Sequence, residues 1–344
     1  MKFGPVPVEQ AVGSILAHHI PRADGGARFR KGKPLTEADV EELRRQGRLT
    51  VYVAGLEPGD VGEDRAAARV AQAVCGPNLL ASRPNVGRVN LQAAVQAVLR
   101  VDAERLLRLN EIEGVTVATR PAFSVLQPRQ TAATIKIIPF AVPEKLLAQA
   151  EALAAEAGPL MEARPMPPRR VALVLSGAPQ ARERTLATFV PPVRARVEAL
   201  GSRLEREVYV PILEEGLGEE DLERAVRAAL AEGAGLVVLA GETAVMDRRD
   251  MAPRAVERLG GQVELYGAPV DPGSLLMLAY LGETPVLGAP GCARSPRANV
   301  LDWVLPRLLS GERLSRRDVL LLGHGGLLEG LQEGASWRER LPQE

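Results

Sequence analysis

The sequence contains few residues of the types that carry disulfide, zinc or base-stacking chemistry. Only two of its 344 residues are cysteine. Cys75 and Cys292 lie far apart and show no paired spacing, which excludes a disulfide framework and a cysteine-based zinc site. Phe, Trp and Tyr together make up 3% of the chain, so stacking platforms for single-stranded nucleic acid are mostly excluded.

The chain also lacks a net charge and a long hydrophobic run. Lys and Arg number 43, as do Asp and Glu, so there is no global electrostatic footprint for nucleic acid or an anionic membrane. The longest apolar stretches, 235–240 and 275–281, fall short of the about 20 residues that span a bilayer, and residues 1–12 show no signal-peptide pattern. We therefore expect a cytoplasmic protein with small-molecule or protein partners, and no nucleic acid or membrane.

The composition that is present is that of a folded protein with more than one domain. Hydrophobic residues make up 46% and charged residues 25% of a chain that is long enough for at least two cores. Composition shifts at 158–170, where Pro159, Pro165, Pro167 and Pro168 follow an Ala-rich and Leu-rich helical pattern. The sequence thus predicts an N-terminal region at 1–167, a second domain at 168–311 and a C-terminal tail at 312–344.

The N-terminal region has the pattern of an irregular α+β fold of one or two subdomains. Strands are expected at 13–20, 50–54, 114–119 and 131–139, and helices at 36–46, 64–74 and 145–157. Thr36 is expected to cap the first helix, with Asp39 completing a capping box. This region carries no motif whose chemistry is evident from its residues alone.

After the boundary, short apolar strands alternate with amphipathic helices, which is typical of βαβ units. Strands are expected at 171–175, 207–212, 236–240, 262–266 and 285–287. Helices are expected to begin at Pro191-Pro192 and to cover 219–232, 249–259 and 296–309, the last with an interruption at Pro306. The predicted architecture is a three-layer α/β domain with a mostly parallel sheet.

Three loops follow the predicted strands of this domain, at 176–179, 241–250 and 288–296. Ligands bind at the carboxyl ends of parallel strands because helix N-termini direct free N–H groups there. In the middle loop Glu242, Asp247 and Asp250 flank Arg248 and Arg249, a set that can hold Mg²⁺ and a phosphate. The alternative is that Asp247 or Asp250 simply caps the following helix.

Residues 236–311 resemble the molybdopterin-binding domain of molybdenum-cofactor biosynthesis proteins of the MogA and MoeA type. The resemblance rests on motifs in order, at 240–241, Arg249-Asp250 with Pro253, 260–261, 270–273, 288–291 and 299–309. Segments 56–64, 87–91 and 133–140 resemble the N-terminal part of a bacterial subfamily that is sometimes fused to a domain similar to molybdopterin cytidylyltransferase.

The resemblance implies binding of molybdopterin or its nucleotide form, with the pterin phosphate across the strand-end loops. It implies Asp250 and Asp247 as catalytic acids that hold Mg²⁺ in adenylyl transfer or molybdenum insertion, and it implies a homo-oligomer. The implied cofactor-binding residues are Ser176, Gly177, Gly241, Glu242, Thr243, Pro272, Gly273, Pro290, Gly291 and Ser295. Two alternatives stay open: a non-catalytic carrier or partner of a nucleotidyltransferase or molybdoenzyme, and a nucleotide pyrophosphatase related to nicotinamide-nucleotide salvage proteins.

Two residues depart from the family pattern. Glu242 stands in a turn that is Gly-rich in relatives, and it places a negative charge where a phosphate would be held. Glu242 therefore turns outward, binds metal, or marks a protein that does not handle the nucleotide. Cys292 stands where many relatives have Asn, and with no histidine nearby in sequence we interpret it as a non-catalytic loop residue.

Overall fold

The computed structural model describes residues 1–21, 29–213, 218–242 and 245–328. Its internal contacts divide the chain into two compact units, Met1–Pro165 and Met166–Glu344. The division between Pro165 and Met166 falls within the proline-rich segment 158–170. The sequence placed the boundary there between residues 167 and 168. None of the helices in the described residues is long and apolar enough to cross a membrane.

The first unit is an irregular α+β assembly built on several small sheets. Their strand orders are β1-β3-β2, β5-β6-β10-β8, β11-β4 and β12-β7-β9. The strands are β1 (Lys2–Pro7), β2 (Ile15–Leu16), β3 (Thr50–Gly55), β4 (Asp60–Gly62), β5 (Leu79–Ala81), β6 (Arg88–Ala93), β7 (Ala97–Val101), β8 (Val115–Thr119), β9 (Val125–Leu126), β10 (Thr131–Ile137), β11 (Ala141–Pro143) and β12 (Met161–Pro165). The helices are α1 (Glu37–Arg45), α2 (Glu63–Val74), α3 (Ala103–Asn110) and α4 (Glu144–Ala155).

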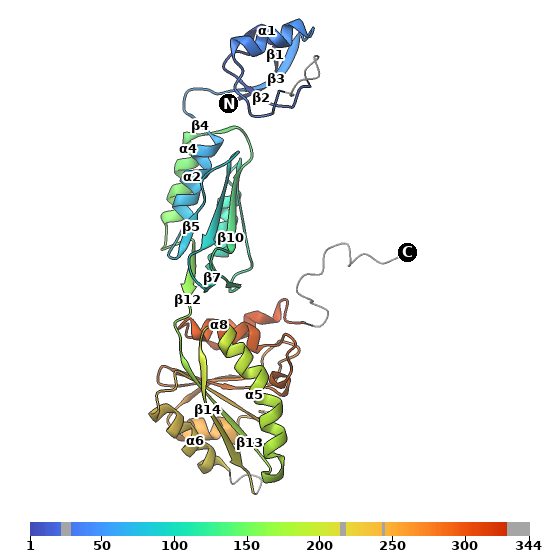
Figure 1. Ribbon diagram of the computed structural model, residues 1–344. Coiled ribbons are helices and arrows are strands. Elements are labelled where there is room, and N and C mark those ends of the chain that lie inside the picture. Colours follow the sequence, from blue (N-terminus) through green and yellow to red (C-terminus); the bar gives the residue numbers. More distant parts are fainter. Residues whose placement is uncertain (22–28, 214–217, 243–244, 329–344) are drawn as a thin grey trace. The chain divides into compact units, whose positions relative to one another are not determined.

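The core of this unit lies between helices α2 and α4 and the four-stranded sheet (Figure 1). Alternate residues of the central strands, such as Val89 and Leu91 in β6 and Ile135 and Ile137 in β10, are buried. Their neighbours along each strand are less buried, which is the period-2 pattern of a sheet that is covered on one face.

Local chemistry explains where the predictions for this unit held and where they failed. The capping box of α1 is confirmed, because Thr36 and Asp39 each accept the other's backbone N–H. Strand β1 was not predicted, since Pro5 and Pro7 interrupt its pattern. It lies at the edge of its sheet, where a missing N–H can face away from the ladder. The expected strand at 13–20 shrinks to β2, since Gly13 has a φ of 79°.

The second unit contains a six-stranded sheet in the order β14-β13-β15-β18-β17-β16. The strands are β13 (Arg170–Gly177), β14 (Arg203–Pro211), β15 (Leu236–Gly241), β16 (Gln262–Tyr266), β17 (Met277–Leu281) and β18 (Thr284–Gly288). Strands β14, β13, β15 and β18 run parallel, and β17 is antiparallel to both of its neighbours. The sheet is therefore mostly parallel, but one of its strands is reversed.

Helices cover both faces of this sheet, which completes the expected three-layer α/β architecture. The helices are α5 (Arg182–Ala199), α6 (Glu219–Ala231), α7 (Met251–Arg258), α8 (Leu301–Leu309) and α9 (Arg316–Leu320). Helices α6 and α7 share a buried core with one face of the sheet. Helix α5 lies on the opposite face (Figure 1) and is tied to α8 by an ion pair between Arg196 and Asp302, 2.9 Å long.

Three predictions for this unit were wrong. Helix α5 begins at Arg182 and contains Pro191 and Pro192, which are not fully buried, so the helix can bend away from its missing hydrogen bonds. Helix α8 runs through Pro306 without interruption and begins later than expected, at Leu301. Strand β17 was not predicted, because its apolar run has no helix on either side and forms a hairpin with β18.

The segment expected as a tail packs onto the second unit as far as the structure describes it, to Leu328. Leu314 and Val319 are fully buried. The buried guanidinium of Arg307 binds Glu312 and Asp318 at 2.7 Å and 3.3 Å, which joins α8 to α9. Ser315 caps α9 through a second capping box with Asp318.

Candidate functional site

The neighbouring parallel strands β13 and β15 lead to opposite faces of the sheet. The chain continues from β13 into α5 on one face and from β15 into α7 on the other. Near the ends of these strands Ser176 pairs with Gly241. Open α/β sheets bind ligands at such a switch point, outside the carboxyl ends of the strands. The candidate site therefore centres on Ser176 and Gly241.

Gly241 allows the two strand ends to approach closely. A Cβ atom at this position would lie 2.0 Å from the carbonyl oxygen of Ser176, a distance that no side chain tolerates. Glycine is thus required here by backbone contact. The next residue, Glu242, donates its own N–H to the Ser176 carbonyl at 3.0 Å, which continues the pairing into the loop.

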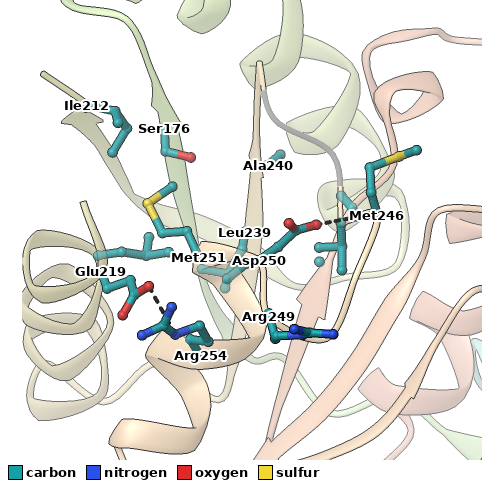
Figure 2. A pocket seen from close by; sticks show the side chains of 15 residues that line it. Ser176, Ile212, Glu219, Leu239, Ala240, Met246, Arg249, Asp250, Met251 and Arg254 are labelled. Atoms are coloured by element: carbon teal, nitrogen blue, oxygen red, sulfur yellow. Dashed lines mark hydrogen bonds and ion pairs between the residues drawn. The ribbon is translucent and has the colours of Figure 1, made fainter. Parts of the chain in front are cut away.

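A cavity of about 430 Å³ opens at these strand ends on the face covered by α6 and α7 (Figure 2). Its floor is apolar and is lined by Leu222, Leu239, Ala240, Val245 and Met251. Polar groups around it come from Ser176, Glu219, Arg249, Asp250 and Arg254. A concave apolar surface with a few polar groups is typical of sites for small molecules.

The Asp250 carboxylate organises the loop on this side of the cavity. It accepts the backbone N–H of Met246, drawn as a dashed line in Figure 2, and that of Asp247 at 2.9 Å. Asp250 occupies the N-cap position of α7 but makes no side-chain hydrogen bond to that helix. The alternative that Asp250 simply caps this helix does not hold, because its carboxylate closes the preceding turn.

The described residues do not form a ready Mg²⁺ site. The Asp247 carboxylate accepts the Arg249 N–H at 2.9 Å and lies 3.4 Å from the Arg249 guanidinium. Asp250 uses one carboxylate oxygen for two backbone N–H groups. Within the ranges that the structure covers, no three His, Cys, Asp or Glu side chains gather closely enough to hold a metal ion. As placed, Asp247 and Asp250 do not fit the expected metal ion.

Glu219 is a site residue that sequence reasoning missed. It is the first residue of α6, and its side chain is only 7% exposed. It lies 3.1 Å from Arg254 and 3.4 Å from Arg258, which come from α7, and Figure 2 shows the first of these contacts. Arg254 and Arg258 are four residues apart and therefore lie on the same side of α7. This spacing is the sequence signal that could have indicated an acidic partner for both arginines.

A second hollow, of about 340 Å³, lies on the α5 face of the same strand ends. We call it the α5 crevice. It is lined by Arg184, Thr185, Thr188, Phe189, Gly241, Glu242, Gly291 and Arg294. The switch point thus has a mostly apolar cavity on one face and a crevice with two arginines on the other.

Glu242 lines the α5 crevice, and 31% of its side chain is exposed. Its carboxylate accepts the backbone N–H of Ala178 at 3.0 Å and a hydrogen bond from Arg184 at 2.6 Å. The Tyr209 hydroxyl donates to the carbonyl of Ala178 at 2.7 Å. Burial, followed by the charge of Glu242, raises the pKa of Tyr209. The Glu242 carboxylate thus bonds to donors of its own chain at the rim of the crevice.

The loop after β18 borders the crevice at Gly291, where an added Cβ would meet nothing within 4 Å. Arg196, another residue that sequence reasoning missed, holds this loop in place from α5. Its guanidinium donates to the carbonyl oxygens of Ala293, Ser295 and Arg297 at 3.3, 2.9 and 2.8 Å. The side chain of Arg196 is only 9% exposed, so these bonds are well shielded from water.

Of the other predicted binding residues, those in the described part of the chain line neither hollow. Pro272 and Gly273 pack on the segment before α8, where a Cβ at Gly273 would lie 2.4 Å from the Val300 Cβ. Ser295 accepts the N–H of Arg297 at 3.2 Å, and Pro290 precedes the turn at Gly291–Arg294. The main chain of Gly177 lies against Glu242. Thr243 lies outside the described residues.

Cys292 is not poised as a nucleophile. Its side chain is half-buried, and this burial raises the pKa of the thiol above its ordinary value. A raised pKa leaves the sulfur protonated at neutral pH, whereas catalysis requires a thiolate. The interpretation as a non-catalytic loop residue remains the better one.

In the first unit, the family-like segments form structural contacts. Asp60 binds the N-terminal ammonium group at 2.7 Å, and Asp64 accepts the N–H of Gly87 at 2.6 Å. Lys136 lies 3.5 Å from Glu63. These contacts hold turns and strand ends in place.

Comparison with known proteins gives matches to one sequence family and to solved structures. Residues 5–55 match a family described as a domain of unknown function (DUF8806). No curated protein sequence matches the chain.

Two solved structures resemble the chain weakly. One is a molybdopterin biosynthesis MoeA protein from Pyrococcus horikosii, 15% identical, covering 90% of this chain and 75% of its own, with a TM-score of 0.29. Another is a molybdopterin biosynthesis protein from Mycobacterium abscessus, 18% identical, covering 42% of this chain and 93% of its own, with a TM-score of 0.30. At these scores neither superposition defines a shared fold.

Proposed function

We propose that this chain binds molybdopterin and acts in molybdenum-cofactor biosynthesis. The observation that carries the proposal is the switch point between β13 and β15. A mostly apolar cavity lies there on one face of the sheet, and the α5 crevice lies on the other. The motifs at 240–241, 249–253 and 288–291 supply these loops, and they are the motifs that resemble the molybdopterin-binding domain. The geometry and the sequence pattern thus support the same place in the fold.

The two hollows suit different parts of such a ligand. The floor of Leu239, Ala240 and Met251 would receive a flat ring system, since apolar walls exclude water from its faces. The guanidinium groups of Arg184 and Arg294 would attract a phosphate in the α5 crevice. Open space beside Gly291 would admit it.

Among the alternatives, the site best supports a carrier, or a partner of a nucleotidyltransferase or molybdoenzyme. Adenylyl transfer, molybdenum insertion and pyrophosphate hydrolysis of a nucleotide all draw on a cation held by carboxylates. Here Asp247 and Asp250 already bind backbone N–H groups of their own loop. A binding role requires only the shape and the charge that these hollows provide.

Copurification tests this proposal. The full chain is purified from a molybdenum-replete host, oxidised, and assayed for released fluorescent pterin. We expect close to one pterin per chain, and an unrelated protein of similar size from the same host serves as the control. Absence of pterin above that control would contradict the proposal. Release of AMP or pyrophosphate from candidate nucleotide substrates would instead favour a catalytic role.

Self-association is part of the same proposal, because the resemblance implies a homo-oligomer. Light scattering on the full chain gives the mass in solution directly. We expect a dimer or trimer, and a strict monomer at high concentration would count against this point.

A further inference from the structure

Two hydrogen bonds hold the Glu242 carboxylate at the switch point, although 31% of its side chain is exposed. Glu242 immediately follows β15, and its two carboxylate oxygens bind different donors: Oε2 binds the Ala178 N–H and Oε1 binds Arg184. The carboxylate lies so close to the Gly177 main chain that a Cβ on Gly177 would be 2.8 Å from Oε2.

The donors that Glu242 uses are those that a phosphate oxygen would use. A backbone N–H at a strand end together with an arginine is a common donor set for phosphate. Arg294 lines the same α5 crevice and adds a second positive charge. The crevice therefore has the donors of an anion site, and an anion from its own chain engages two of them.

We propose, on the basis of the function proposed above, that Glu242 is an internal competitor for the phosphate position of the α5 crevice and weakens phosphate binding there without preventing it. A ligand phosphate gains the Ala178 N–H and Arg184 only when the carboxylate moves away. If Glu242 stays, the two negative charges share one crevice and repel each other. A ligand group with little or no negative charge is not repelled by Glu242 and does not need to displace it.

Phosphate binding to charge-matched variants tests the inference. Glu242→Gln removes the charge but keeps an acceptor for Ala178, whereas Glu242→Ala removes the whole acceptor. The probes are inorganic phosphate and AMP, and calorimetry on the full chain gives Kd. Because a carboxylate and a phosphate repel strongly at about 4 Å, we expect each variant to bind phosphate about tenfold more tightly than the wild-type chain.

The control is Glu283→Gln, which makes the same change in net charge. The Glu283 side chain is 94% exposed and lies in the turn that precedes β18, at the end of the strands opposite the α5 crevice. Its variant should bind phosphate as the wild-type chain does. Adding Arg184→Gln to Glu242→Ala should abolish the gain, because the arginine would then be missing from the vacated position.

Two outcomes would overturn the inference: equal phosphate affinity in the wild-type chain and Glu242→Gln, or an equal gain in Glu283→Gln. Circular dichroism and thermal melting confirm that each variant is folded, and the isosteric Gln variant decides the matter if Glu242→Ala does not fold. Inorganic phosphate and AMP replace molybdopterin in this experiment. A failure of the proposed function, seen as absence of copurified pterin, is therefore distinguishable from a failure of this inference.

Discussion

Ser176 and Gly241 bring β13 and β15 so close together that a methyl group on Gly241 would lie 2.0 Å from the Ser176 carbonyl oxygen. The contact is between backbone atoms, which cannot rotate away as a side chain can. The switch point depends on this approach, because Ser176 lines the cavity on one face and Gly241 lines the α5 crevice on the other.

Gly241→Ala is expected to destabilise the second unit. The new methyl group would force the strands apart, at a cost of about 1–3 kcal/mol in the free energy of unfolding. Urea denaturation measures this loss. Gly291→Ala is the matched control, since an added Cβ there meets nothing within 4 Å, and we expect it to change stability by less than about 0.5 kcal/mol. Equal stability of the two variants would contradict the close approach.

Gly291→Val is expected to block the proposed ligand while leaving the fold intact. The valine side chain would project into the open space beside the α5 crevice, where nothing opposes it in the protein alone. Pterin recovered after purification should fall to background while the melting temperature falls only slightly. If pterin were recovered at the wild-type level, Gly291 would lie away from the ligand.

Asp250→Asn tests whether Asp250 only holds its loop in place or whether its carboxylate also serves the ligand. Both N–H groups bind one carboxylate oxygen, which the amide oxygen of asparagine can replace, so the loss of stability should be about 1 kcal/mol or less. Asp250→Ala leaves both N–H groups without this acceptor and should cost more, about 2 kcal/mol. We expect Asn to lower pterin recovery, because Asp250 lines the cavity proposed for the ring, and Asn replaces its second carboxylate oxygen, a hydrogen-bond acceptor, by an NH₂ donor. Unchanged recovery with intact folding would leave Asp250 as a loop residue alone.

Acid stability of the first unit should depend on Arg69. This guanidinium joins α2 to α4 through Glu144 and Glu151, at 2.7 Å and 2.8 Å, and its hydrogen bonds hold the pKa of each glutamate below the ordinary value of 4.5. A lowered folded-state pKa means that the stabilisation is fully present above 4.5 and is lost as the pH falls through the folded pKa.

Urea denaturation at a series of pH values from neutral to below 4.5 tests this dependence. Arg69→Gln should be less stable at neutral pH and should lose less additional stability as the medium is acidified. Arg227→Gln, which removes an arginine from an exposed pair on α6, is the control and should follow the wild-type curve. Parallel curves for Arg69→Gln and the wild-type chain would exclude this role for Arg69.

Sequence pattern alone was sufficient for features that arise from near neighbours. The Thr36 and Asp39 capping box, the buried run of β15 and the alternation of strands and helices after residue 170 depend on residues a few positions apart. The boundary region was visible for a similar reason, since clustered prolines act on the local backbone. The strand-end loops followed from that alternation, whereas Gly241 was indicated only by the resemblance.

Tertiary structure decided the features that depend on which elements become neighbours. The direction of β17, the division of the predicted residues between two faces, and the bonds from Glu242 to Ala178 and Arg184 join positions far apart in the chain. The same holds for Arg196, which reaches carbonyl oxygens about a hundred residues away. The order of the strands and the direction of the crossovers decide which of these residues become neighbours. Both are properties of the assembled sheet, so no local sequence periodicity encodes them.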